Sequence, residues 1–193
     1  MVWTVGCGKN TAPISATPAG AGSGSYPADN DADCLPDIPL VDQYGHRVSL
    51  ASFKGRPVLI DFFYADCATA CPLLTAKFSA VAKLLGPELG SKVTLLSVTI
   101  DPEHDDPADL LKYARSHEAD YKGWLFLTGK PIDVINVLRR YGVRRERNQD
   151  GTLSHVATCF LIGPDGRQRR VYDALDVPPA TVVADVGRAA ARG

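Results

Sequence analysis

The chain has 193 residues, of which 45% are hydrophobic and 22% are charged, and its formal net charge is −1. This size and composition suit one globular domain with a full hydrophobic core. The near-neutral charge argues against nucleic acid or an anionic membrane surface as a partner, and no apolar run has the length of a membrane span. The five cysteines do not have the spacing of a disulfide-stapled mini-protein, and their odd number leaves at least one thiol over.

Residues 1–33 are predicted to form a flexible N-terminal tether. The segment 11–33 is dominated by Ala, Gly, Ser, Pro and Asp and has no apolar periodicity, so it cannot bury enough surface to offset the entropy of ordering. Ahead of it, Val5-Gly6-Cys7 resembles the end of a bacterial lipoprotein signal, although too few residues precede it for a working signal peptide. Either the true start lies further upstream or the resemblance is accidental.

The folded domain is predicted to span residues 34–193 and to begin with a short hairpin at residues 38–41 and 47–50. A central strand follows at residues 57–64, and it is apolar on both faces except at Asp61. Beyond this strand, helices and strands alternate, and Gly or Pro stands at most of their ends. Their expected ranges are 72–85 (helix), 93–100 (strand), 106–117 (helix), 124–127 (strand), 131–141 (helix), 155–162 (strand), 169–172 (strand) and 178–191 (helix).

This order of elements predicts an α/β fold. Right-handed crossovers make the first strands parallel, and the last two strands form an antiparallel hairpin. The expected architecture is thioredoxin-like, with a central mixed sheet flanked by helices on both faces. In such a sheet, functional residues are expected at the carboxyl ends of the parallel strands.

Two cysteines, Cys67 and Cys71, lie where the central strand ends and the first helix begins. On a helical path this spacing places both sulfurs on one face, one turn apart. Such a pair can close a disulfide, or it can offer two thiolates to one soft metal ion. The positive end of the helix favours the thiolate form, most directly at Cys71. Two idle, buried cysteines are the alternative, but a pair at a strand-to-helix turn more often carries redox or metal chemistry.

His155 is the candidate third member of this site. It opens the expected fourth strand, in which alternation places His155, Ala157 and Cys159 on one face. Because this strand is expected beside the central one, the imidazole can approach the two thiols. An imidazole and two thiolates suit a cuprous ion, and could hold a cupric or zinc ion less selectively. A solvent-facing histidine at the start of a strand is the alternative.

The other polar candidates have simpler interpretations. We expect His46 and His117 to face solvent. His104 is expected in a loop at the edge of the site, while Asp61 and Asp101 are potential hydrogen-bond partners of the site residues. A core carboxylate whose hydrogen bonds are satisfied is the alternative for Asp61.

Two further cysteines and one charged run complete the candidates. Cys34 is expected to carry an unpaired thiol. Cys159 is expected to be a small buried core residue, with an extra thiol facing the site as the alternative. The charged run 139–147 is expected to be a solvated face, with partner docking as the alternative.

Several motifs occur in order between residue 35 and the C-terminus. They are Asp42-Gln43-Tyr44-Gly45, Phe53-Lys54-Gly55, Phe63-Tyr64-Ala65-Asp66-Cys67-Ala68-Thr69-Ala70-Cys71-Pro72, Ser97-Val98-Thr99-Ile100-Asp101-Pro102-Glu103, Leu127-Thr128-Gly129, and His155 leading to Leu161-Ile162-Gly163-Pro164-Asp165-Gly166. With these motifs the chain resembles the Sco/SenC family of copper-binding proteins, which are involved in assembling cytochrome c oxidase. The Cys-x3-Cys-Pro element with the late histidine is the specific part. The Asp-x-x-Gly and Asp-Pro elements are weaker, because peroxiredoxin-like proteins share similar ones.

The resemblance implies that copper is the bound ion and that Cys67, Cys71 and His155 are its ligands. Two positions depart from the family pattern. Ala68 stands where a proline usually follows the first cysteine, which loosens the loop, and Cys159 stands where an apolar residue is usual.

The resemblance also implies a metallochaperone that delivers copper to the binuclear copper site of cytochrome c oxidase. The implied partners are the copper-bearing subunit of the oxidase and another copper chaperone or a thiol reductant. Such a protein would be exported to the periplasm or the outer face of the cytoplasmic membrane and anchored through its N-terminus.

The alternative function is that of a thiol-disulfide oxidoreductase. Its redox-active pair, Cys67 and Cys71, would reduce the target's cysteines before metal loading. Against a general reductase, the spacing is Cys-x3-Cys rather than Cys-x2-Cys, and no proline lies between Pro131 and Pro164.

Overall fold

The computed structural model describes residues 34–150, 152–155 and 157–191. Its main sheet has seven strands in the order β2-β1-β5-β4-β3-β8-β9. These strands are β1 (Pro39–Asp42), β2 (Arg47–Ser49), β3 (Val58–Phe63), β4 (Thr94–Thr99), β5 (Trp124–Thr128), β8 (Thr158–Ile162) and β9 (Gln168–Asp173). The α-helices are α1 (Ala70–Leu85), α2 (Pro107–Ser116), α3 (Pro131–Tyr141) and α4 (Pro179–Ala190).

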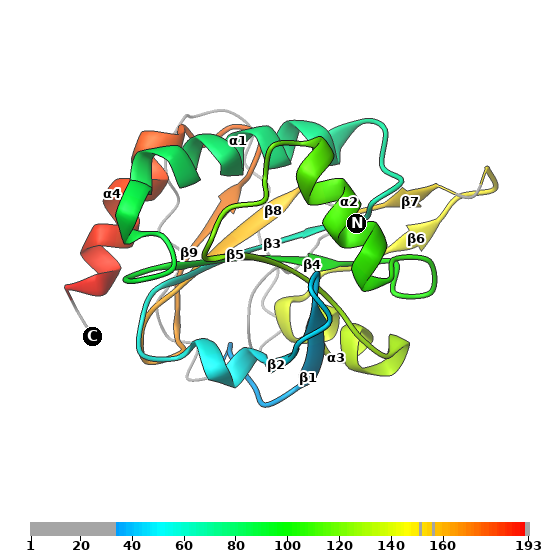
Figure 1. Cartoon of the computed structure of the whole chain (residues 1–193), viewed down its shortest axis with the longest axis horizontal. Coiled ribbons are helices and arrows are strands. Elements are labelled where there is room, and N and C mark those ends of the chain that lie inside the picture. Colours follow the sequence, from blue (N-terminus) through cyan, green and yellow to red (C-terminus); the bar gives the residue numbers. More distant parts are fainter. Residues whose placement is uncertain (1–33, 151, 156, 192–193) are drawn as a thin grey trace, which may run out of the picture.

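The helices form a layer on each side of the sheet. Helices α1, α2 and α4 lie on one face, and α3 lies on the other (Figure 1). Strands β3, β4 and β5 are parallel, β8 runs antiparallel to β3, and β9 runs antiparallel to β8. Every residue of β3 and β4 is buried, because both faces of these central strands are covered. The predicted α/β, thioredoxin-like fold is confirmed.

Most expected elements are present, with ends shifted by a few residues. Helix α2 shows why the start of a helix can be predicted from its capping residues. The Asp106 carboxylate accepts the N–H groups of Ala108 and Asp109, and the Asp109 carboxylate accepts the N–H of Asp106. This reciprocal cap satisfies donors that the first turn leaves unpaired.

The segment before His155 differs from the expectation. The polar run forms a hairpin of β6 (Glu146–Arg147) and β7 (Leu153–Ser154), which projects beyond the sheet (Figure 1). Strand β8 begins only at Thr158, so the expectation that His155 opens this strand is wrong. Strands of two residues are too short to show an alternation of apolar and polar side chains, which is why the sequence pattern missed them.

Cys34 also differs from the expectation. It is fully buried and disulfide-bonded. The expected unpaired thiol is therefore wrong, because cysteine pairing cannot be deduced from one sequence.

The predicted tether, residues 1–33 with Cys7, lies outside the described residues and stays a prediction. Among the helices that the structure describes, none combines the length and the apolar character that crossing a bilayer requires.

Candidate metal centre

The two thiols lie where β3 turns into α1, at the carboxyl edge of the parallel strands, with Cys67 on the short loop and Cys71 in the first helical turn. Burial on both faces fixes β3 up to Phe63, and the loop is then held by Asp105. The Asp105 carboxylate accepts the Ala65 N–H at 3.2 Å and the Thr99 hydroxyl hydrogen. Inside the loop, the Cys67 N–H donates to the Tyr64 carbonyl at 3.2 Å. These bonds fix the backbone from which Cys67 projects.

Cys67 and Cys71 are in direct contact. Helix α1 begins at Ala70, so Cys67 precedes the helix and Cys71 lies in its first turn. The Cys71 N–H donates to the Cys67 sulfur at 3.4 Å. The Cys67 sulfur therefore accepts an N–H of the first helical turn, which the Thr69 side chain leaves uncapped.

This geometry decides which thiol ionises first. The hydrogen bond with the Cys71 thiol lowers the pKa of Cys67, and the backbone N–H of Cys71 adds to the effect. The same hydrogen bond raises the pKa of Cys71, and burial acts in the same direction. The expectation that Cys71 gains most from the helix end is wrong, because its thiol donates to Cys67 instead of receiving the helix N–H groups.

The structure brings His155 to the same place. Its Nε2 lies 3.9 Å from the Cys71 sulfur, although His155 follows β7 rather than opening β8. Sulfur and nitrogen bound to one ion at about 2.3 Å and about 2.0 Å are at most about 4.3 Å apart. The spacing of Cys71 and His155 is compatible with a shared ion.

The side chains of Cys67, Cys71 and His155 are near one another, but their donor atoms are not arranged to coordinate one ion. Within residues 34–150, 152–155 and 157–191, no three Cys, His, Asp or Glu side chains are gathered tightly enough to hold a metal ion. Binding at this site therefore requires a local adjustment of the donors. The cysteines are 7% and 1% exposed and His155 is half-buried, so His155 has the most room to move.

Asp61 and Cys159 lie deeper under the site. Both pair in register across β3 and β8, and Asp61 also pairs with Ser97 on β4, so the three side chains share one face of the sheet. Cys159 is buried and lines a small space with residues of α1 and α4, such as Phe78 and Val182. Its expected role as a core residue agrees with this position.

The remaining histidines do not join the thiols. His46 is exposed and bonds to Asp42. His104 is exposed and bonds to Asp101, and His117 is half-buried, with its ring stacked on Tyr113.

Ion pairs hold the base of the β6–β7 hairpin. Asp101 was a potential partner of the site residues, but its carboxylate accepts from Arg147 at 2.8 Å instead. Arg145 makes two hydrogen bonds to Glu103, at 2.7 and 2.6 Å, and one to the Ile100 carbonyl. The expected solvated face is wrong for Arg145, whose side chain is packed against the end of β4. Sequence reasoning missed this role, because a run of charged residues does not show which of them form ion pairs with distant parts of the chain.

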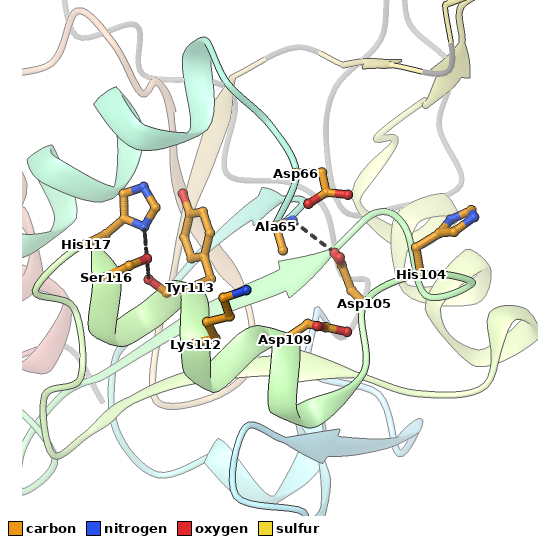
Figure 2. A pocket seen from close by; sticks show the side chains of 9 residues that line it. All are labelled: Ala65, Asp66, His104, Asp105, Asp109, Lys112, Tyr113, Ser116 and His117. Carbon is orange, nitrogen blue, oxygen red and sulfur yellow. Dashed lines mark hydrogen bonds between the residues drawn. The ribbon is translucent and has the colours of Figure 1, made fainter.

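A polar pocket lies beside the thiol loop. Figure 2 shows this pocket, which has a volume of about 170 Å³, between α2 and the residues that precede Cys67. Asp66 lines it from the thiol loop and Asp105 from the connection that leads into α2. Lys112 lines it from α2, and His117 from the end of that helix. Burial raises the pKa of Asp105 to about 6. Sequence reasoning did not single out Asp105, although an aspartate after a parallel strand and before a helix cap is a usable signal.

These features define a class of protein: a thioredoxin-like domain with two thiols at the strand-to-helix turn and a histidine beside them. Residues 28–191 match the family model SCO1/SenC. The chain belongs to the SCO1/SenC family, as its motifs predicted.

Known relatives agree with this assignment. The chain is 33% identical over 150 residues to the SCO1 protein homolog of Bacillus subtilis (strain 168), which covers 75% of this chain and 77% of the relative. Among solved structures, it is similar to copper-bound ScoI of Bradyrhizobium japonicum, with 30% identity, a TM-score of 0.71, and coverage of 80% of this chain and 98% of ScoI. It is similar also to BsSco, described as a member of the Sco family of cytochrome c oxidase assembly proteins with a disulfide switch, with 29% identity, a TM-score of 0.71, and coverage of 81% and 92%.

Proposed function

We propose that this protein is a copper metallochaperone that binds one copper ion through Cys67, Cys71 and His155. The observation that carries the proposal is the meeting of the three side chains: the Cys67 sulfur accepts the Cys71 N–H at 3.4 Å, and the His155 Nε2 lies 3.9 Å from the Cys71 sulfur. The copper-bound ScoI structure supports copper as the ion, and the description of BsSco supports cytochrome c oxidase assembly as the process. The proposed recipient is the binuclear copper site in the copper-bearing subunit of the oxidase.

The donor set suits copper for a chemical reason. Thiolate sulfur is a soft ligand that favours Cu(I), and imidazole is compatible with both oxidation states of copper. Cys67 is the thiol that ionises first, so it offers the thiolate form that binds a metal ion. Cys71 must lose its proton when the ion binds.

The three ligands differ in how firmly the fold holds them, and this difference suggests an order of release. Both cysteines are buried at the start of α1, Cys67 just before the helix and Cys71 in its first turn, whereas His155 is half-buried on a connection between strands. We propose that a ligand of the recipient first replaces His155, and that the thiolates follow by exchange.

The test is an anaerobic titration of the protein in its reduced and oxidised forms. The reduced protein is expected to bind one equivalent of copper in competition with a chelator. After air oxidation, mass mapping is expected to find Cys67 linked to Cys71, and this form should bind no copper tightly. The adjacency of the sulfurs allows this disulfide, and its very small loop makes it readily reducible.

Two results would count against the proposal. A disulfide between Cys71 and Cys159 would overturn the site geometry. Failure of the reduced protein to bind copper, together with reduction of a disulfide in a peptide carrying the recipient's cysteines, would replace the metallochaperone by the thiol-disulfide oxidoreductase.

We further propose that the protein works outside the cytoplasm, in the periplasm or at the outer face of the membrane, and is anchored there. The disulfide at Cys34 supports this place, because structural disulfides persist in oxidising compartments. In cells producing the full-length gene product, the protein is expected in the exported membrane fraction. After unfolding in denaturant, Cys34 is expected to resist alkylation until reductant is added, because burial no longer protects it there. Recovery from the cytosol with an alkylated Cys34 would contradict the export.

A further inference from the structure

The position of His155 depends on how the β6–β7 hairpin is held. The ion pairs of Arg145 with Glu103 and of Arg147 with Asp101 hold the first strand of this hairpin, β6, and the residue before it. His155 follows the second strand, β7, so its position also depends on what β7 contacts.

Tyr64 supplies such a contact. The Leu153 N–H, two residues before His155, donates to the Tyr64 hydroxyl at 3.3 Å. Tyr64 stands three residues before Cys67, and its carbonyl accepts the Cys67 N–H. One residue therefore bonds to the segment that carries His155 and to the segment that carries the first thiol.

The bond between Tyr64 and Leu153 is shielded from water. The Tyr64 and Leu153 side chains are each only 7% exposed. Because water cannot readily take the place of a buried acceptor, loss of the Tyr64 hydroxyl would cost the Leu153 N–H this hydrogen bond. A phenylalanine would fill the same space but could not accept the bond.

We propose that Tyr64 is a positioning residue, whose hydroxyl holds the His155 segment against the thiol loop and thereby keeps His155 available as the third copper ligand. The proposal rests on the ligand set proposed above. It also explains how a histidine on an irregular connection stays near two thiols that are fixed by β3 and α1.

The first test needs no metal. In the reduced, copper-free protein, Tyr64→Phe is expected to speed amide exchange at Leu153 about fivefold, since one hydrogen bond is lost. Amides of β3 should keep their protection, which shows that the variant is folded. Tyr141→Phe is the matched control, because it removes a buried hydroxyl that donates to a backbone carbonyl, that of Cys34, on the other face of the sheet. This control should leave exchange at Leu153 unchanged.

The second test is a double-mutant cycle on copper affinity. Tyr64→Phe is expected to weaken copper binding about fivefold in the presence of His155, and much less in the His155→Ala background. Non-additivity of this kind is a signature that a merely structural role would not produce.

The outcomes separate this inference from the proposed function. Unchanged exchange at Leu153, or an equal loss of affinity in both backgrounds, would overturn the role of Tyr64 while leaving the ligands in place. Wild-type affinity in His155→Ala alone would instead overturn the ligand set, and with it the role given to Tyr64.

Discussion

Replacement of Cys67 or Cys71 by alanine is expected to abolish tight copper binding, with a loss of more than about 100-fold in affinity. Removal of groups that merely orient a metal ligand already costs about 10–100-fold, and loss of a ligand costs more. Each variant keeps one thiolate and one imidazole. With a single soft ligand, the site can no longer compete with free thiols in solution for Cu(I). His155→Ala should cost less, because two adjacent thiolates remain.

Cys159→Ala is the matched control for these variants. It removes a thiol that is as buried as Cys71 but lies between α1 and α4. Its copper affinity should equal that of the wild type, measured by chelator competition under anaerobic conditions. Full affinity in Cys67→Ala or Cys71→Ala would show that the ion binds elsewhere.

The second large effect is expected at Asp61. Its side chain is 1% exposed, and among the described residues its Oδ1 has no hydrogen-bond partner. Burial raises the pKa of Asp61 from 3.8 to about 7, an effect that Ser97 only partly offsets. The folded protein thus prefers the neutral acid, and the charged form costs stability.

The sign of the pH dependence follows from this raised pKa. Below pH 3.8 the acid is protonated in both states, and ionisation costs nothing. As the pH rises from there to about 7, the unfolded chain releases the proton first, so the free energy of unfolding falls by up to about 4 kcal/mol. Asp61→Asn avoids this cost, and its stability advantage should be on the order of 2–4 kcal/mol at about pH 8 and near zero at about pH 4.

Urea unfolding of the reduced, copper-free protein at several pH values measures this effect. Asp37→Asn, at an exposed carboxylate, is the control and should not change the pH profile of the wild type. An advantage of Asp61→Asn that stays constant between pH 4 and pH 8 would mean that ionisation of Asp61 is not its source.

The sequence by itself determined the fold and the identity of the thiols. The apolar run of β3 and the proline after Cys71 mark a buried strand that turns into a helix, and these are local signals that the folded structure keeps. The alternation of strands and helices then limits the sheet to a parallel core with an antiparallel end. For this reason Cys67 and Cys71 could be placed at the edge of the sheet before any contact was known.

The surroundings of the thiols were decided only by the tertiary structure. Strand periodicity placed His155 on β8, yet it reaches Cys71 from an irregular segment. The neighbouring hairpin bonds to Tyr64 and forms ion pairs with residues that follow β4. Three other features could not be predicted from the sequence either: the order in which the thiols ionise, the disulfide of Cys34 and the unpartnered oxygen of Asp61. Each depends on which groups meet across distant parts of the chain and how far water is excluded from them, and neither property is encoded in local periodicity.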